Sequence, residues 1–141
     1  MRIIFPSTTG KLCAVLRTAF SGMFTDVFSD AYGTSVTVGP ELPATKTARM
    51  VTVTDNSGPD DGVQTRRRYG INVWARRQDA ELLALLCMAV LRSCADGQPI
   101  TATDSFSGPY SIPDDPAYVV DGADLVHFFF TLRVSARGVD Y

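Results

Sequence analysis

One segment constrains the fold more than any other part of the chain. Between Asp124 and Arg137, apolar and mixed residues alternate at every second position. A period of two places successive side chains on opposite faces of a strand, so the pattern predicts a long strand with one face in the core. The core set is Val126, Phe128, Phe130, Leu132 and Val134, and the mixed set is Leu125, His127, Phe129, Thr131, Arg133 and Ser135.

Two further segments predict strands that pair into the same sheet. Residues 47–54 alternate and are rich in β-branched side chains, which favours a strand. Residues 63–76 alternate as well, and the intervening residues 55–62 consist of turn-forming types, so we expect a hairpin with a long acidic loop. One face of the second strand carries Tyr69, Ile71, Val73 and Ala75, and the other carries Arg66, Arg68, Asn72, Trp74 and Arg76. A short strand is also expected at residues 35–38.

Two segments predict helices. Residues 7–28 place apolar side chains three and four positions apart, with an N-cap available among residues 7–9. The second helix starts near Asp79, as N-cap or first-turn acid, and runs to about Ala95 before Gly97 ends it. Its apolar residues cover most of the circumference: Leu82, Leu83, Leu85, Leu86, Met88, Ala89, Val90 and Leu91. We therefore expect this helix to be buried on more than one side, with a second chain covering part of it.

The order helix, strand, strand, helix, strand predicts an α+β fold with an antiparallel or mixed β-sheet and two helices packed mainly on one face. The length of 141 residues fits one domain, residues 1–141. Segments 39–47, 55–62 and 104–121 are rich in Gly, Pro or Asp, so we expect mobile loops that order on assembly. No apolar run has the length of a membrane span or of a signal peptide, so we expect a soluble, unexported protein.

The cysteines do not indicate a metal site. Cys87 and Cys94 lie seven positions apart on the second helix, which separates them by about 10 Å. Structural zinc sites use closer pairs, and His127 is the only histidine. With Cys13 they make an odd number of cysteines, all within apolar segments, which favours buried, reduced thiols. We expect no metal and no cofactor.

No catalytic pattern is present. A nucleophilic enzyme needs a base, usually histidine, beside a serine or cysteine, and His127 falls in the middle of a strand. The carboxylate pairs Asp60–Asp61 and Asp114–Asp115 lie in Pro/Gly-rich loops, where adjacent side chains diverge into solvent. The chain also lacks a glycine-rich phosphate loop. A small hydrolase using His127 stays as a minor alternative, and we expect a protein that is not an enzyme.

The arginines of residues 66–76 allow three interpretations. Arg66, Arg68 and Arg76 share a strand face with Trp74, and arginine and tryptophan are both enriched at protein interfaces. The same residues could form a basic, aromatic strip for nucleic acid, or a solvated face. The net charge of −2 favours the protein interface. The residues predicted to lie at a subunit or partner interface are Arg66, Arg68, Trp74, Arg76, Leu83, Met88, His127 and Phe129.

The segments from residue 47 to 138 resemble the tail terminator (tail completion) proteins of long-tailed bacteriophages, nearest to those of actinobacterial phages. The resemblance is carried by a strand, an Ala/Leu-rich helix, a Gly/Pro turn and a long closing strand. In this chain they read "RRRYGINVWAR", "DAELLALLCMAVLRSC", "GPYSIPD" and "HFFFTLRVSARG". The arginine-rich composition, with eleven arginines and two lysines, agrees with a genome of high GC content.

The resemblance implies a structural virion protein made in the host cytoplasm and located at the head–tail interface. Its subunits would form a hexameric ring that caps the tail tube, ends tail polymerisation and contacts both the tube protein and a head-side stopper or connector protein. DNA would pass only transiently through the lumen, and no membrane is involved. The alternatives are another neck or head–tail connector protein, a minor tail protein, or a small nucleic-acid-binding module.

Overall fold

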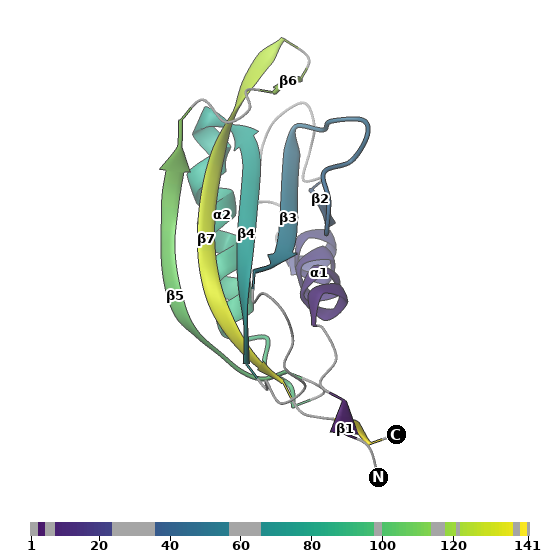
Figure 1. The fold of residues 1–141 in the computed structure, drawn as a ribbon. Helices are drawn as coiled ribbons and strands as arrows, with labels where there is room; N and C mark the ends of the chain where they lie inside the picture. Colours follow the sequence, from purple (N-terminus) through teal and green to yellow (C-terminus); the bar gives the residue numbers. More distant parts are fainter. Residues whose placement is uncertain are drawn as a thin grey trace.

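The computed structural model describes residues 3–4, 8–23, 36–56, 66–97, 100–113, 118–120, 122–136 and 139–140. Along the chain they form β1 (Ile3–Ile4), α1 (Thr9–Thr18), a π-helical turn η1 (Ala19–Met23), β2 (Thr37–Gly39), β3 (Arg49–Asp55), β4 (Arg66–Arg76), α2 (Arg77–Arg92), β5 (Ile100–Ile112), β6 (Val119–Val120), β7 (Ala123–Ala136) and β8 (Val139–Asp140). Strands β1 and β8 pair with each other and bring the two ends of the chain together (Figure 1).

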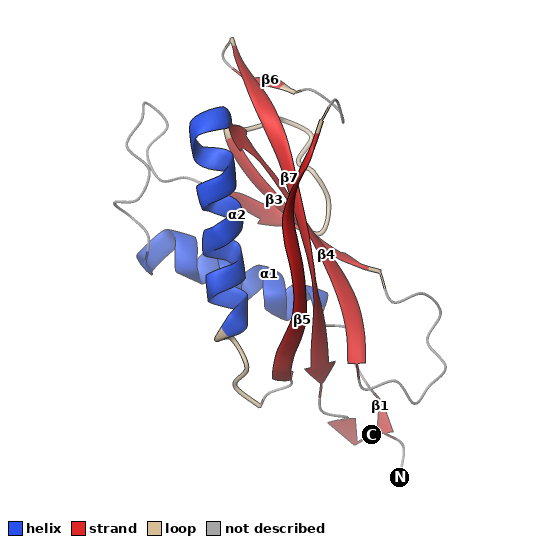
Figure 2. Ribbon diagram, turned by 90° about the vertical axis from the view of Figure 1, so that its left-hand side faces the viewer, coloured by secondary structure: helices blue, strands red, loops and turns tan. Residues whose placement is uncertain are grey.

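The remaining strands form one twisted sheet of six strands. Its order is β2-β3-β4-β7-β5, with β6 paired to the end of β7. Strand β2 runs parallel to β3, and every other pairing is antiparallel, so the sheet is mixed. Helices α1 and α2 lie on the same side of this sheet (Figure 2). The α+β class and the placement of both helices on one face are thereby confirmed.

The core lies between the helices and the sheet. Residues that face each other in the β4–β7 pair point to the same side of the sheet. On the side of the helices these residues are Tyr69, Ile71 and Val73 of β4 and Phe130 and Leu132 of β7. Helix α2 adds a stripe at three- and four-residue spacing, which consists of Ala80, Leu83, Ala84, Cys87, Met88 and Leu91. The two-faced alternation predicted for β4 is confirmed.

Two polar contacts fix the helices to the sheet. The side chain of Arg49 on β3 is fully buried, and its Nη2 lies 3.1 Å from Oδ2 of Asp79 in the first turn of α2. At α1, the backbone N–H and the hydroxyl of Thr8 both donate to the Tyr69 hydroxyl oxygen, at 3.0 and 2.8 Å. Both contacts join elements far apart in sequence, so they specify how each helix docks. Asp79 is therefore a first-turn acid, and the N-cap of α2 is Arg76.

The segment 104–121 differs from its prediction as a loop. Its first part belongs to β5, a 13-residue edge strand that pairs with β7. The pairing register shifts between Asp104 and Ser107 and again between Ser107 and Tyr110, and Gly108 has a φ of +114°. These irregularities let a Gly/Pro-containing segment follow the strand beside it. Hydrogen bonding to β7 therefore overrides the local turn composition.

The other two predicted loops have different outcomes. Residues 40–48 form an irregular connection from β2 to β3, in which Lys46 Nζ donates to the Pro43 carbonyl at 2.7 Å. Of the acidic segment 55–62, Asp55 ends β3 and Asn56 follows it, and the rest lies outside the described residues.

Strand β2 forms the edge of the sheet opposite β5. There the guanidinium of Arg17 on α1 donates to the carbonyl oxygen of Val38 in β2, at 2.7 and 3.0 Å.

Gly70 in the middle of β4 makes room for a neighbouring ring. A Cβ at this position would lie 3.0 Å from Cε2 of Phe129 and 2.5 Å from Nδ2 of Asn56. Asn56 is exposed and can move, whereas the Phe129 ring is packed on the sheet. We expect Gly70→Ala to lower the free energy of unfolding by about 1–2 kcal/mol, measured by urea denaturation.

The matched control for this substitution is Gly10→Ala in α1. No atom lies within 4 Å of a Cβ at Gly10, so the extra methyl meets open space. The variant is expected to raise the free energy of unfolding by up to about 1 kcal/mol, because alanine loses less backbone entropy than glycine in a helix. Equal changes for the two variants would show that Phe129 does not pack on Gly70 as described.

Candidate interaction surfaces

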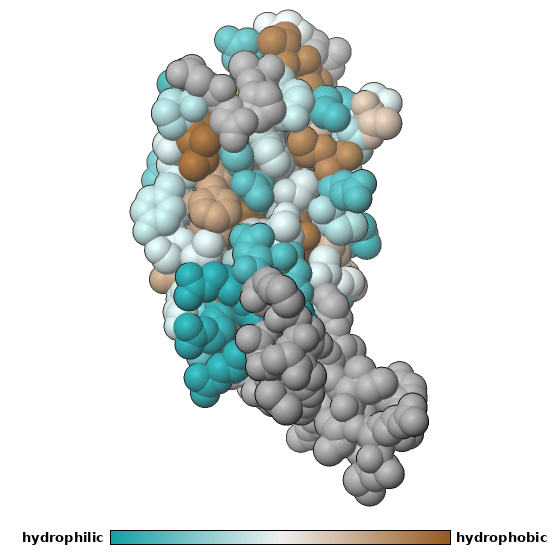
Figure 3. Space-filling model, in the orientation of Figure 1, coloured by the Kyte–Doolittle hydropathy of each residue, from teal (hydrophilic) through white to brown (hydrophobic). Residues whose placement is uncertain are grey.

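The side of the sheet opposite the helices is not covered by either helix, and we call it the open face (Figure 2). The strand register assigns to it Met50 and Thr52 of β3, Arg66, Arg68, Asn72, Trp74 and Arg76 of β4, Tyr110 of β5, and Leu125, His127, Phe129, Thr131 and Arg133 of β7. In Figure 3 hydrophobic areas lie over its upper half, and a hydrophilic area covers the lower ends of β5, β7 and β4. The open face is therefore divided into an apolar and a polar end.

The apolar end contains a series of stacked side chains. The rings of Trp74 and His127 lie nearly parallel, with centroids 4.4 Å apart and planes 15° apart. Tyr118, just before β6, meets Trp74 edge-on at 6.2 Å, and Lys46 lies 5.4 Å above the Tyr118 ring. His127 Nε2 donates to Oδ1 of Asn72 at 2.8 Å. We call these residues the Trp74 stack; it joins the β2–β3 connection, the start of β6 and the sheet.

The Trp74 stack is a packed structure and not an open cleft. Trp74 is 6% exposed and His127 is 7% exposed. Met50, Trp74 and Leu125 form a second small core, against which Leu42, Tyr118 and Val120 pack. The indole N–H of Trp74 is buried without a hydrogen-bond acceptor among the described residues. The contacts described for His127, with Asn72 and Trp74, are those of a side chain fixed by packing, and neither partner is a nucleophile.

The structure separates the arginines that the sequence placed together. Arg66 and Arg68 are exposed at the lower end of β4, whereas Arg76 is half-buried at the upper end, opposite Leu125. Ten residues of strand separate Arg66 from Arg76, which is about 33 Å. The predicted set thus divides into a pair of arginines at one end, Phe129 in the middle and the Trp74 stack at the other end.

Besides Trp74 and His127, which are buried in the Trp74 stack, two further predicted interface residues are buried. Leu83 and Met88 lie in the core between α2 and the sheet, 0% and 4% exposed, so their assignment as contact residues of the folded protomer is corrected. The exposed leucines of α2 are Leu82 and Leu85, at 42% and 46%. In the sequence, small and apolar residues recur at three- and four-residue steps from Ala80, and this spacing indicates the buried side of α2. Leu82 and Leu85 fall outside that series, so the spacing would have placed them on the outer side.

Three other surface residues were missed by the sequence analysis. Arg133 of β7 lies directly opposite Arg68 of β4 and joins the arginine pair. Tyr110 and Val119 are large apolar side chains that are 52% and 61% exposed. Arg133 could have been found from the alternation of residues 124–137, because it falls on the same mixed face as His127 and Phe129. Tyr110 could not, because its strand was predicted as a loop.

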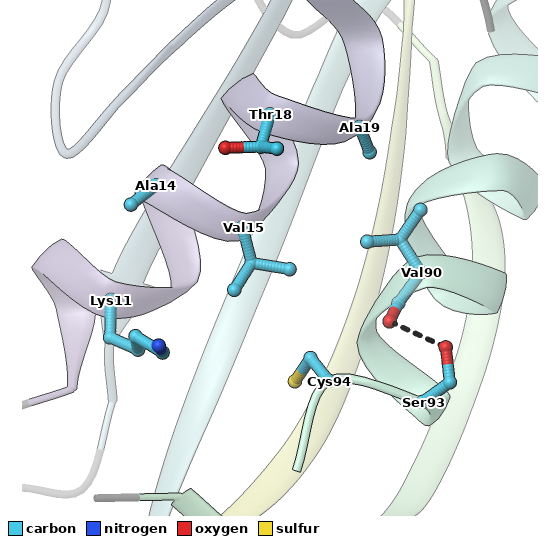
Figure 4. A pocket seen from close by; sticks show the side chains of 8 residues that line it. All are labelled: Lys11, Ala14, Val15, Thr18, Ala19, Val90, Ser93 and Cys94. Carbon is cyan, nitrogen blue, oxygen red and sulfur yellow. Dashed lines mark hydrogen bonds between the residues drawn. The ribbon is translucent and has the colours of Figure 1, made fainter. Parts of the chain in front are cut away.

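A shallow groove lies on the other side of the molecule, between α1 and α2 (Figure 4). It has a volume of about 440 Å³ and is lined by Lys11, Ala14, Val15, Thr18, Ala19, Val90, Ser93 and Cys94. Near it, Lys11 Nζ lies 2.8 Å from Oδ2 of Asp96, an ion pair that joins α1 to the segment after α2. The lining is mainly apolar, and among the described residues that form it Lys11 alone is charged.

Metal and thiol chemistry find little support among the described residues. No group of three or more His, Cys, Asp or Glu side chains in this part of the chain could hold a metal ion. All three cysteines are free, and burial raises the pKa of Cys13, Cys87 and Cys94 above the ordinary thiol value. A raised pKa leaves less thiolate at neutral pH, which makes these thiols poor nucleophiles.

Comparisons with known proteins add no assignment. No model of a known protein family matches the chain, and a search of curated proteins finds no match. Within the described residues, no helix has both the length and the hydropathy needed to cross a membrane.

Proposed function

We propose that this protein is a structural virion protein that forms a ring on the phage tail tube, ends tail polymerisation and joins the tail to the head connector. The observation that carries the proposal is the position of the exposed apolar side chains. Leu82 and Leu85 lie on the helix layer, and Tyr110 and Val119 lie on the sheet layer. Apolar surface on two different layers of one protomer supports contact between copies through unlike surfaces.

The geometry of such a contact leads to a ring or a filament. A two-fold dimer uses the same patch on both copies, whereas contact between the helix layer of one copy and the sheet layer of the next is head-to-tail. Repeating that contact closes a ring if the rotation per subunit divides a full turn. An α+β subunit is also what the resemblance to tail terminators implies.

The ring can be tested by measuring mass in solution. We expect multi-angle light scattering over a concentration series to detect monomers and six-subunit rings. Leu82→Ser/Leu85→Ser should remove the ring and leave the monomer, because it replaces the apolar side chains of the helix layer. Glu81→Gln is the control, since it changes an exposed neighbour on the same helix and keeps the leucines. A stable two-subunit species at every concentration would contradict the head-to-tail contact.

Another neck protein would use the same kind of surface, so its role must be separated in assembled particles. If the protein caps the tail, particles made without it should carry overlong tails, seen by electron microscopy. If it instead closes the head, the particles should be filled heads without tails. The first outcome supports a tail terminator, and the second supports a head-side stopper.

A further inference from the structure

A short two-stranded arm projects from the sheet at the beginning of β7. It consists of β6 and the first residues of β7, where Val119 pairs with Asp124 and Val120 pairs with Ala123. Figure 1 shows these paired strands beyond the upper ends of β3 and β4. We call this pair of strands the arm, and it extends past the body of the protomer.

The arm presents an apolar side chain to solvent. Val119 is 61% exposed, the highest value among the exposed large apolar residues of the described chain. The neighbouring Val120 and Tyr118 pack instead against the second small core. These contacts anchor the base of the arm, so Val119 is held outward by a fixed support. A valine in this position gains free energy when another surface covers it.

The groove between α1 and α2 is hollow where the arm projects (Figure 4). Its walls follow rows of residues four positions apart, which lie above one another on a helix. Leu82, one of the exposed leucines of the helix layer, starts the row on α2, so the groove continues the apolar surface of that helix. The row on α2 is Leu82, Leu86, Val90 and Cys94, and the row on α1 is Lys11, Val15 and Ala19.

The polar groups on the α2 side of the groove bond to their own helix. The Ser93 hydroxyl donates to the carbonyl oxygens of Ala89 and Val90, at 3.4 and 3.3 Å. The Cys94 thiol donates to the Leu91 carbonyl oxygen at 3.2 Å. Small-molecule sites use polar groups that converge on the ligand and fix its orientation. The groove therefore suits an apolar side chain of a protein better than a small polar ligand.

Charge complementarity favours the arm as the occupant. Residues directly opposite each other in an antiparallel pair point to the same side, so Val119 and the exposed Asp124 reach one surface together. Among the described lining residues of the groove, Lys11 carries the charge. One of its N–H groups donates to Asp96 at 2.8 Å, and an ammonium group has three. Lys11 can therefore hold a second carboxylate beside an inserted valine.

We propose that the arm of one copy docks in the groove of the next copy, with Val119 between Val15 and Val90 and with Asp124 at Lys11. This assignment rests on the proposed ring, because it names the two surfaces that meet at each subunit contact. The arm and the groove are different surfaces of one protomer, so the contact is head-to-tail. Each copy inserts one arm and receives one.

The anchoring of the arm excludes insertion into the groove of its own protomer. Tyr118 meets Trp74 on the open face, whereas the groove lies between the helices on the other side of the sheet. Tyr110, the other exposed apolar side chain of the sheet layer, is a poorer candidate for insertion. It belongs to the body of the sheet, and its hydroxyl is held by Ser107 Oγ at 2.6 Å.

Disulfide cross-linking of the full chain tests the contact. Val119→Cys places a thiol on the arm, and Cys94 supplies one in the groove, whereas Cys13 and Cys87 are buried. Oxidation with diamide should give a ladder of covalent multimers up to six subunits on a non-reducing gel, because each copy carries both thiols. A disulfide needs Cα atoms about 4.4–6.8 Å apart, so the ladder reports direct docking.

The controls are matched cysteine variants. Val119→Cys/Cys94→Ser should lose the ladder, and Thr54→Cys, at an exposed position of β3, should give none. Because Cys94 is half-buried, a second pair is needed. Val119→Cys/Cys94→Ser/Ala14→Cys places an exposed thiol on the α1 wall and should restore the ladder. Absence of a ladder from both pairs would overturn the arm contact.

Light scattering separates failure of this contact from failure of the proposed function. Val119→Ser should raise the protein concentration needed for half-assembly by about tenfold. Rings that form equally well in this variant would overturn the arm contact and keep the ring. Monomers at every concentration of the wild type would overturn both. A ladder that continues past six subunits would support the contact and replace the ring with a filament.

Discussion

Asp79→Ala is expected to lower the free energy of unfolding by about 3–5 kcal/mol, because it leaves a buried guanidinium without its carboxylate. The Arg49 side chain has no exposed surface, and the Asp79 carboxylate at 3.1 Å is 16% exposed. Water can therefore reach the acid but not the arginine. Urea denaturation followed by circular dichroism measures the loss.

Because Arg49 is more deeply buried than Asp79, we expect the two single substitutions to differ in their effect. Arg49→Met should lower the free energy of unfolding by less than Asp79→Ala does. It leaves behind the Asp79 carboxylate, which still reaches water. This carboxylate also lies in the first turn of α2, where the helix dipole favours a negative charge. The double variant Arg49→Met/Asp79→Leu should recover part of the loss, since no buried charge remains. A cost below about 1 kcal/mol for Asp79→Ala would show that the pair does not hold α2 to β3.

Trp74→Ala is the second substitution with a large expected effect, a loss of about 3–5 kcal/mol in the free energy of unfolding. The indole is almost fully buried, stacks on His127 and meets Tyr118 edge-on. Its removal leaves a cavity in the second small core, which has few residues available to fill it. The measurement is again urea denaturation, read by circular dichroism because Trp74 is the single tryptophan.

Trp74→Phe separates the ring from the indole nitrogen. The Trp74 N–H has no acceptor among the described residues, so phenylalanine gives up no described hydrogen bond and keeps an aromatic surface against His127. The expected cost is about 1 kcal/mol, from the smaller ring alone. If Trp74→Phe cost as much as Trp74→Ala, an unseen hydrogen bond of the indole, and not stacking, would dominate its contribution.

Long, unbroken patterns were predictable from the sequence. The alternation in β4 and β7 extends over more than ten residues each, so the assignment of their two faces did not depend on any single residue. Strand β5 was not predictable, because Gly108 and Pro109 interrupt its pattern and its pairing with β7 determines its conformation. Helix α2 was placed correctly, but the choice of Leu83 over Leu82 as a contact residue ignored which side faces the sheet.

The candidate surfaces were less predictable than the fold because they depend on strand register. Trp74 and His127 meet because they lie opposite each other in the β4–β7 pair, and Arg68 and Arg133 meet for the same reason. A shift of one residue would move every side chain of a strand to the other face. Sequence patterns give the faces of each strand but not the register, so they could identify these residues without showing which of them are neighbours.

The two edges of the described sheet limit how copies of this protein can associate. A guanidinium group lies against β2 at one edge, and β5 at the other edge contains Pro109, which has no N–H, and several bulges. Both features disfavour the addition of another strand. Growth into an amyloid-like ribbon is thereby discouraged at either side, and copies of the chain that meet in solution would do so through side chains. Such contacts can be undone by salt or by a single substitution, so association between copies stays reversible.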